Sequence, residues 1–300
     1  MIRIGVDFGG TKIEAAALAP SGTVVARARE ANPGNYAAAI ETVCRVVAAV
    51  EGEAGARLDR LGVGVPGSLS PHSGLMRNAN STWLNGKPFD RDLAAALGKA
   101  VRMQNDANCF ALSEAVDGAG AGAGVVFGAI LGTGCGGGVA VGGEARNGLN
   151  GIAGEWGHMP LPWPTAQERC AHRCWCGRQD CLETWVAGSA FVADYQRATG
   201  VKLDGSEIVT RARAGEAEAT AALDRYIDRL GRALAVVCDI LDPDVIVLGG
   251  GMSKVDELYE RLPEAVASHA FSDVFRTPIR PPVHGDSSGV RGAAWLWPWD

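Results

Sequence analysis

The sequence has no run of basic residues and no excess of positive charge. Its 300 residues include 28 lysines and arginines against 34 aspartates and glutamates, which gives a formal net charge of −6. A protein that binds nucleic acid through its phosphates needs concentrated positive charge. The sequence therefore predicts that no nucleic acid is a partner.

The sequence also lacks an apolar leader and a continuous apolar segment of membrane-spanning length. The opening residues reach a charge at Asp7, with no apolar stretch long enough for a signal peptide. Residues 118–143 carry no charge, but twelve of these positions are glycine, which disfavours a membrane helix. We expect a cytoplasmic protein with no membrane partner.

Apolar residues are plentiful, and glycine is unusually common. Apolar side chains make up 47% of the chain and charged ones 21%, which is the balance of a folded globular protein. A chain of this length can hold two domains of ordinary size. The 41 glycines cluster in short bursts, which indicates tight turns or close approach of a ligand to the backbone.

The hydrophobic pattern predicts an α/β protein with two related halves. Residues 2–18 form a strand, a glycine turn and a second strand, and residues 125–141 repeat this order. Further strands are expected at 23–29, 61–65, 101–104 and 245–248, and helices at 36–53, 91–97, from 106, 182–199, 206–213, 216–241, 255–269 and 288–297.

The first glycine turn has residues that suit a polyphosphate. It lies between two strands, so it matches neither the Walker loop nor the dinucleotide fingerprint, which both run from a strand into a helix. Backbone N–H groups at glycines can approach phosphate closely, and an aspartate can hold a metal through water. The residues are Asp7, Gly9, Gly10, Thr11 and Lys12. A plain glycine hairpin remains the alternative.

A second turn, Gly132, Thr133 and Gly134, occupies the equivalent place in the second half. Two such turns can hold one phosphate chain from two sides. Farther along, an apolar strand at 245–248 runs into glycines that include Gly250 and Gly251. Bare backbone of this kind admits a flat ring or a ribose, although the segment taken alone favours an ordinary strand-to-helix connection.

Asp106 lies where a strand gives way to a helix. The usual explanation of such an aspartate is that it is the N-cap of the helix. The functional alternative is that the helix N-terminus keeps the carboxylate ionised, so that it can take a proton from a hydroxyl that attacks phosphorus.

Four of the eight cysteines fall within twelve residues, which favours a metal site over disulfides in a chain with no export signal. His158, Cys174, Cys176 and Cys181 supply three thiolates and one imidazole, a set that suits tetrahedral Zn²⁺. Four protein ligands leave no position for water, which indicates a structural ion. Cys170 and His172 are rival ligands, and free thiols in a surface loop are the alternative.

Together these motifs resemble the ROK family of sugar kinases and repressors. The resemblance spans the whole chain and rests on the ordered set Asp-x-Gly-Gly-Thr, Asn-Asp-Ala-Asn, Gly-Thr-Gly, Glu-x-Gly-His and Cys-x-Cys-Gly-x-x-x-Cys. The segments 78–86, 153–163 and 284–295 are most similar to the bacterial fructokinases of the manno(fructo)kinase type within that family.

The resemblance implies the actin-like ATPase (ribonuclease H-like) fold, with two domains around a cleft. It implies a small domain at 1–118 plus about 288–300 and a large domain at 119–287 that carries the zinc loop. It further implies that MgATP donates its γ-phosphoryl group to a hexose hydroxyl, with fructose as the first candidate and glucose, mannose or an N-acetylhexosamine as alternatives.

The resemblance also assigns roles to residues. Asp106 matches the catalytic base, and Asn80, Asn105, Glu155, His158 and Glu183 match sugar-contacting positions, with Pro66 and Gly67 close by. The two glycine turns match the phosphate loops, and Gly250 with Gly251 the adenosine side. His158, Cys174, Cys176 and Cys181 match the zinc ligands. One departure is Asp180, because the family usually has glycine directly before the last cysteine.

Two other functions are less compatible with the sequence. A sugar-responsive repressor needs a helix-turn-helix arm and a basic surface, and we expect the first strand at Ile2 with no basic patch elsewhere. A zinc-binding interaction module would turn over no ATP. A homodimer is implied by the resemblance alone.

Overall fold

The computed structural model describes residues 2–297 and divides the chain into two compact units. Unit 1 runs to Gly122 and also contains Gly138–Ala153 and the chain from Val283, whereas unit 2 contains Ala123–Gly137 and Gly154–Pro282. The expected large domain covered residues 119–287. Of these, residues 119–122, 138–153 and 283–287 belong to unit 1 instead. Residues 298–300, expected in the small domain, lie outside the described part.

Segment 138–153 belongs to unit 1 because Gly138 and Val139, at its start, pack on the helix of unit 1 that contains Ala107 and Asn108. The backbone N–H of Val139 donates to Oδ1 of Asn108 at 3.2 Å. A Cβ at Gly138 would fall 2.6 Å from the carbonyl carbon of Ala107, so only glycine allows this close approach.

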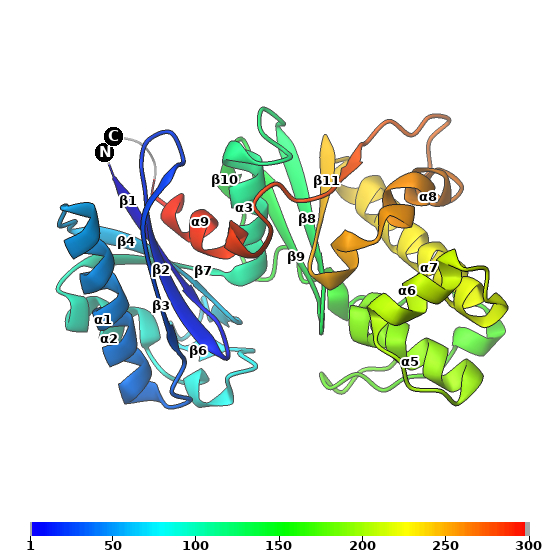
Figure 1. Cartoon of the computed structure of the whole chain (residues 1–300), viewed down its shortest axis with the longest axis horizontal. Coiled ribbons are helices and arrows are strands. Elements are labelled where there is room, and N and C mark those ends of the chain that lie inside the picture. The colour runs from blue at the N-terminus through cyan, green and yellow to red at the C-terminus, as the bar shows by residue number, and fades with distance from the viewer. Residues whose placement is uncertain (1, 298–300) are drawn as a thin grey trace. The chain divides into compact units, whose positions relative to one another are not determined.

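Unit 1 is built on a five-stranded sheet in the order β3-β2-β1-β4-β7. Strands β1, β2 and β3 form an antiparallel meander, and β4 and β7 run parallel to β1 (Figure 1). Their bounds are β1 Arg3–Phe8, β2 Lys12–Leu18, β3 Val24–Ala31, β4 Arg60–Val65 and β7 Ala100–Asn105. The expected opening meander is thereby confirmed.

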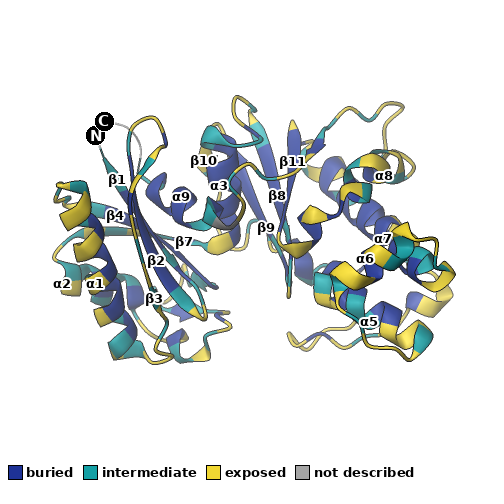
Figure 2. Ribbon diagram, viewed as in Figure 1, coloured by how far each residue is buried: buried dark blue, intermediate teal, exposed yellow. Residues whose placement is uncertain are grey.

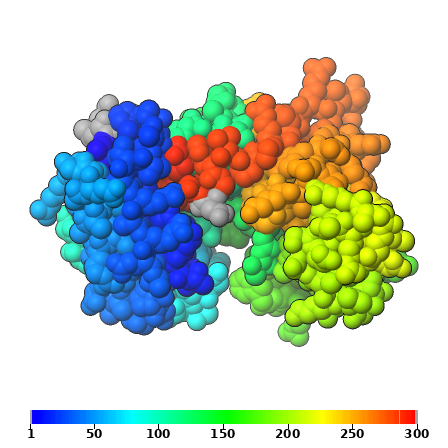
Figure 3. Space-filling model, in the orientation of Figure 1, coloured from blue at the N-terminus to red at the C-terminus, as the bar shows by residue number. Residues whose placement is uncertain are grey.

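Helices cover both faces of this sheet. Helix α1 (Tyr36–Ala54) and helix α2 (Phe89–Leu97) lie on one face, and α3 (Asp106–Asp117) with α9 (Ser288–Ala294) lie on the other (Figure 1). Figure 3 shows the red C-terminal segment beside the blue N-terminal strands. The contact is close because Gly5 has no side chain, and a Cβ there would fall 2.5 Å from the amide nitrogen of Ala294.

The core of unit 1 lies between α1 and the sheet. The buried residues of α1 recur at spacings of three and four, as one face of a helix requires, and this face packs on β2 and β3 (Figure 2). Asn35 caps α1 by accepting the N–H of Ala38 at 3.0 Å. A two-stranded sheet, β5 (Ser68–Leu69) with β6 (Met76–Arg77), and the short helix η1 (Thr82–Leu84) complete the connection to α2.

A second five-stranded sheet has the order β10-β9-β8-β11-β12. Its bounds are β8 Val125–Leu131, β9 Cys135–Val141, β10 Glu144–Ala145, β11 Val245–Gly249 and β12 Ile279–Arg280. The division between the units passes through β9, after Gly137. The predicted repeat of strand, glycine turn and strand is confirmed by β8 and β9.

Unit 2 contains most of the remaining helices. The longest is α7 (Ala217–Leu241), which buries one face against its neighbours in unit 2 (Figure 2). The others are α4 Glu183–Val186, α5 Gly188–Thr199, α6 Gly205–Arg213 and α8 Asp256–Ala267, with the short helices η2 Trp156–His158, η3 Ala166–Glu168 and η4 Gly251–Lys254; η5 Gly285–Ser287 belongs to unit 1.

The single helix expected at 182–199 is wrong, because the structure breaks it at Ala187. This residue is extended, with φ −65° and ψ 154°, and separates α4 from α5. The break lets the N–H of Gly188 donate to the carbonyl of Gly132 at 2.8 Å. Hydropathy alone does not reveal such a break, since the apolar spacing continues through it.

No helix among residues 2–297 is both long enough and apolar enough to span a membrane.

Candidate active site

The first glycine turn connects β1 to β2 and is closed by its own backbone. The N–H of Gly9 donates to the carbonyl of Lys12 at 2.9 Å. Asn32 on the neighbouring segment holds the turn from outside, since its Nδ2 donates to the Gly9 carbonyl at 2.7 Å. Gly10 and Thr11 are exposed at the tip. A turn fixed in this way presents backbone to a ligand without further ordering.

Asp7 stands at the end of β1, directly before the turn. Burial raises the pKa of its carboxyl group to about 6, although the positive charge of Lys12 opposes this shift. A carboxylate that burial makes reluctant to ionise alone gains from a bound cation. The donor set therefore fits a hydrated Mg²⁺.

Asp106 is not the N-cap of α3, contrary to that sequence interpretation. Asn105 is the cap, and its Oδ1 accepts the N–H of Ala107 at 2.9 Å. Asp106 is the first helical residue and is exposed, with Oδ1 accepting the same N–H at 2.8 Å. The helix N-terminus still favours its ionised form. The neighbouring asparagine supplies the cap, and Asp106 stays exposed at the first turn of the helix.

Asn105 also ties α3 to the turn at Pro66 and Gly67. Its Nδ2 donates to the carbonyl of Gly67 at 3.2 Å. Gly67 has φ +78°, and a Cβ there would fall 2.7 Å from the amide nitrogen of Ala79. The predicted residues of unit 1 at 66–67 and 105–106 are thus brought together.

Asn80 is exposed on the adjacent loop. Asn85 fixes this loop by bonding both sides of Ala79: its Oδ1 accepts the Ala79 N–H at 2.9 Å, and its Nδ2 donates to the Ala79 carbonyl at 3.1 Å. Sequence reasoning quoted Asn85 within a motif and gave it no role. Its position five residues after Asn80 was the only available signal.

The second glycine turn connects β8 to β9. The N–H of Gly132 donates to the carbonyl of Gly134 at 3.0 Å. Ser189, at the start of α5, donates its hydroxyl to the carbonyl of Thr133 at 2.6 Å. Gly250 lies beside the turn, since a Cβ there would fall 2.5 Å from the Leu131 carbonyl oxygen. Gly251 begins η4, and a Cβ there would meet nothing within 4 Å.

Glu183 links the second turn to the region expected to hold the sugar. Its Oε2 accepts the N–H of Cys135 at 3.1 Å, and its Oε1 accepts the indole N–H of Trp175 at 2.6 Å. A Cβ at Gly134 would lie 2.7 Å from Oε2, so a larger residue there would push the Glu183 carboxylate aside.

Glu155 and His158 flank a short helix that packs against β9. Trp156 is buried there, and its indole N–H donates to the carbonyl of Gly136 at 2.8 Å. Gly157 approaches Cys135 so closely that a Cβ would fall 3.1 Å from its carbonyl carbon. Glu155 is exposed and His158 half-buried. These contacts fix the backbone on both sides of the two candidate sugar ligands.

His158, Cys174, Cys176 and Cys181 offer ligand atoms that all lie within 4.8 Å of one another. Nδ1 of His158 is 3.7 Å from Sγ of Cys174. Cys170 and His172, the rival ligands, are outside this cluster, and the His172 ring packs on Trp185 with centroids 4.3 Å apart. Three thiols and one imidazole at this spacing fit a tetrahedral Zn²⁺.

Asp180, the departure from the family motif, adopts the conformation that glycine favours. Its φ is +54°, in the left-handed region. Its Oδ1 accepts the N–H groups of Ala171 at 3.0 Å and His172 at 2.9 Å. Aspartate is among the few residues that tolerate this region, and the two hydrogen bonds offset the strain. The turn that the substitution put in question is therefore formed.

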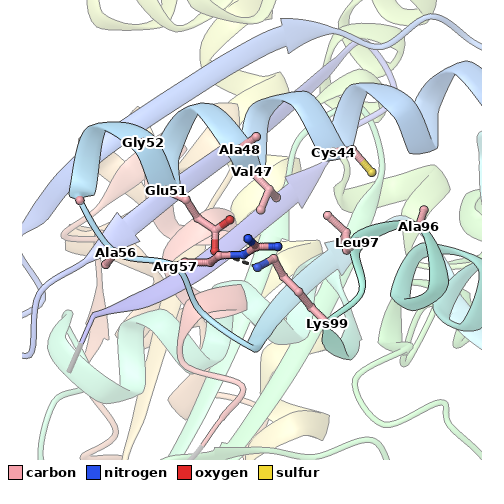
Figure 4. A pocket seen from close by; sticks show the side chains of 11 residues that line it. Cys44, Val47, Ala48, Glu51, Gly52, Ala56, Arg57, Ala96, Leu97 and Lys99 are labelled. Carbon is pink, nitrogen blue, oxygen red and sulfur yellow. Dashed lines mark hydrogen bonds and ion pairs between the residues drawn. The ribbon is translucent and has the colours of Figure 1, made fainter.

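A cavity of about 600 Å³ lies elsewhere, at the C-terminal ends of α1 and α2. Figure 4 shows Glu51, Arg57 and Lys99 converging there. Lys99 donates to Oε1 of Glu51 at 2.8 Å, so its charge is already paired. None of the predicted site residues lines this cavity. It is not the site that the motifs predict.

The comparisons agree with the motifs. The N-acetyl-D-glucosamine kinase of Vibrio cholerae serotype O1 is 39% identical over 297 residues, covering 97% of this chain and 98% of that protein. A ROK hexokinase from Thermus thermophilus is 31% identical, with a TM-score of 0.88 and coverage of 99% and 97%. A ROK family glucokinase from Streptomyces griseus, solved with glucose and AMPPNP, is 26% identical, with a TM-score of 0.79 and 99% coverage of both chains.

The fold and these likenesses define an ATP-dependent sugar kinase with the actin-like ATPase fold. The sequence model of the ROK family matches residues 3–299. The chain belongs to the ROK family.

Proposed function

We propose that the enzyme transfers the γ-phosphoryl group of ATP to a hydroxyl of a hexose, with Asp106 as the general base. The observation that carries this proposal is the exposed carboxylate at the first residue of α3, next to a separate N-cap. A helix N-terminus stabilises a negative charge, so this carboxylate suits acceptance of the proton of the attacking hydroxyl. Asn105, fixed by Gly67, orients the sugar beside it.

The glycine turns hold the phosphates. Backbone N–H groups of Gly10 and Gly134 suit phosphate oxygens, Gly9 leaves room for their approach, and Lys12 adds charge. Mg²⁺ held by Asp7 through water neutralises charge on the migrating group. Gly250 and Gly251 present bare backbone to the adenosine. The close approach of Gly250 to the second turn supports this placement.

The cysteine cluster holds a structural Zn²⁺. All four positions of the tetrahedron come from the protein, so the ion organises the loop and does not activate water. His158, as one ligand, is held in a fixed orientation beside Glu155, and both are proposed to bind sugar hydroxyls together with Glu183 and Asn80.

For the sugar, N-acetyl-D-glucosamine is the first candidate, supported by the name of the 39% identical relative. Fructose is the second candidate, supported by the segments 78–86, 153–163 and 284–295. The two sugars differ in ring form and in the acetamido group, so a pocket built for one leaves polar groups unpaired with the other. We further propose a cytoplasmic homodimer, which sedimentation of the purified enzyme tests.

The decisive experiment measures ADP release with N-acetyl-D-glucosamine, fructose, glucose and mannose for the wild type and Asp106→Asn. Sugar-dependent ADP release should fall by about three orders of magnitude in the variant. Calorimetry should show sugar binding of unchanged affinity. Near-normal turnover in Asp106→Asn refutes the role of Asp106, and an inactive wild type with all four sugars refutes the proposed function.

A further inference from the structure

Trp175 is an exposed aromatic side chain that none of the sequence motifs assigns. It lies between the metal-cluster residues Cys174 and Cys176, and 70% of its surface is exposed. An indole has a large apolar surface, and leaving it in water forgoes a substantial hydrophobic gain. The sequence reaches it only as the variable position of Cys-x-Cys.

Two residues of the proposed sugar site fix the orientation of this indole. Its N–H donates to Oε1 of Glu183 at 2.6 Å. Its ring meets that of His158 edge to face, with centroids 5.1 Å apart and planes at 79°. Exposed tryptophans without such contacts move freely. Trp175 is held in place while most of its surface stays open to solvent.

Glu183 keeps acceptor capacity for a ligand. Its two oxygens have four lone-pair positions in total. The indole N–H of Trp175 and the backbone N–H of Cys135 occupy one on each oxygen. A sugar hydroxyl can therefore donate to Glu183 next to the indole, without displacing either protein donor.

We propose that Trp175 is a sugar-binding residue whose indole packs against the C–H face of the hexose. Because its polar N–H is already bonded, the side chain offers the sugar only apolar and π surface. A hexose ring presents C–H groups on one face and hydroxyls at its edge. Glu183 and His158 take the hydroxyls, and the indole covers the adjoining face. This inference rests on the proposed function and adds a contact to the same site.

The test compares Trp175→Ala and Trp175→Phe with Trp163→Phe. Trp163 is a matched control, because it is also an exposed tryptophan of unit 2. Its ring stacks on His269, with centroids 5.4 Å apart, and His269 is not a predicted site residue. We expect Trp175→Ala to raise the KM for the sugar about tenfold or more and to leave the KM for ATP within about twofold. Trp175→Phe, which keeps a ring, should lie between.

Intrinsic fluorescence gives a readout independent of turnover. Titration with N-acetyl-D-glucosamine or fructose, without nucleotide, should change tryptophan emission of the wild type and Trp163→Phe. The change should be lost in Trp175→Phe. Thermal unfolding and metal content identify any variant that misfolds. If Trp175→Ala misfolds, the KM and fluorescence of Trp175→Phe test the proposal.

The inference is overturned if Trp175→Phe and Trp175→Ala keep the wild-type KM for the sugar, or if Trp175→Phe keeps the fluorescence change. An active wild type with that result leaves the proposed function standing. A wild type that neither binds nor phosphorylates any of the four sugars removes the proposed function itself, and the inference with it.

Discussion

Asp7 and Glu14 lie directly opposite each other on the antiparallel strands β1 and β2. Paired residues of such strands project from the same face, so two carboxyl groups are neighbours beside the first glycine turn. Glu14 is 1% exposed and is surrounded by cations, with Nε of Arg27 at 3.1 Å, Nζ of Lys12 at 3.7 Å and Arg29 in contact. The acidic face is thus balanced by charge from β2 and β3.

This pair predicts how activity depends on pH. Burial and the negative charge of Glu14 raise the pKa of Asp7, whose value is about 6, while Lys12 and Arg29 oppose the shift. The folded protein therefore holds the Asp7 proton more tightly than the unfolded chain does. This preference stabilises the fold fully below the ordinary pKa of 3.8, and the stabilisation is lost as pH rises through about 6. Under the proposed function, the ionised form of Asp7 is the one that would hold Mg²⁺. We expect kcat/KM for MgATP to fall as pH drops below about 6.

Glu14→Gln should move this acid limb to lower pH. The substitution removes a negative neighbour of Asp7 and releases Lys12 and Arg29 from their carboxylate, and both changes lower the pKa of Asp7. Glu30→Gln is the control, because Glu30 pairs with Arg45 on α1 and is not among the charges that act on Asp7. A pH profile of Glu14→Gln that coincides with the wild type would show that Asp7 does not govern the limb.

Two helical glycines should respond oppositely to the same substitution. Gly292 of α9 packs against α3, and a Cβ there would overlap the backbone carbonyl of Cys109. Gly292→Ala should lower the free energy of unfolding by about 3 kcal/mol, because two helices must separate. Gly52 of α1 has nothing within 4 Å of a Cβ, so Gly52→Ala should raise stability by about 0.5–1 kcal/mol. Chemical denaturation measures both, and equal effects would contradict the packing of α9.

The sequence predicts the elements well where local signals suffice. The bounds of α1 and of β8 follow from apolar spacing and flanking turn residues. Donor types and spacing predict the four metal-cluster residues, and the structure leaves the rivals Cys170 and His172 outside the cluster. Each of these features is encoded within a short stretch of chain.

Features that depend on contacts between distant residues are not predicted. The break at Ala187 is set by Gly132, which is more than fifty residues away. Asn105 replaced Asp106 as the cap because either residue type satisfies the rule, and only geometry decides. Two partners of Glu14, Arg27 and Arg29, lie on β3, and the contact of Trp175 with Glu183 requires the folded loop. Such contacts leave no periodic signal.

Asp180 predicts a graded series of variants. Asp180→Asn keeps the acceptor oxygen for Ala171 and His172 and tolerates φ > 0, so it should match the wild type. Asp180→Gly relieves strain but loses both hydrogen bonds, and Asp180→Ala loses them while keeping the strain. We therefore expect stability and zinc affinity to fall in the order Asn, Gly, Ala, with Ala about 2 kcal/mol below the wild type. A competitive zinc chelator measures the affinity, and an alanine variant equal to the asparagine variant would contradict this account.

Removal of the metal should loosen the cysteine loop and weaken sugar binding, while ATP binding persists. Burial raises the pKa of the Cys181 thiol to about 12, so Zn²⁺ must displace its proton, and zinc affinity should fall as pH decreases. Cys181→Ser should contain less than about a tenth of an equivalent of zinc and unfold several degrees below the wild type. Cys170→Ser is the matched control, because Cys170 is exposed and lies outside the cluster. Metal analysis by mass spectrometry and thermal unfolding test the pair. Loss of zinc from Cys170→Ser would show that Cys170 is a ligand, and full zinc in Cys181→Ser would exclude the proposed set.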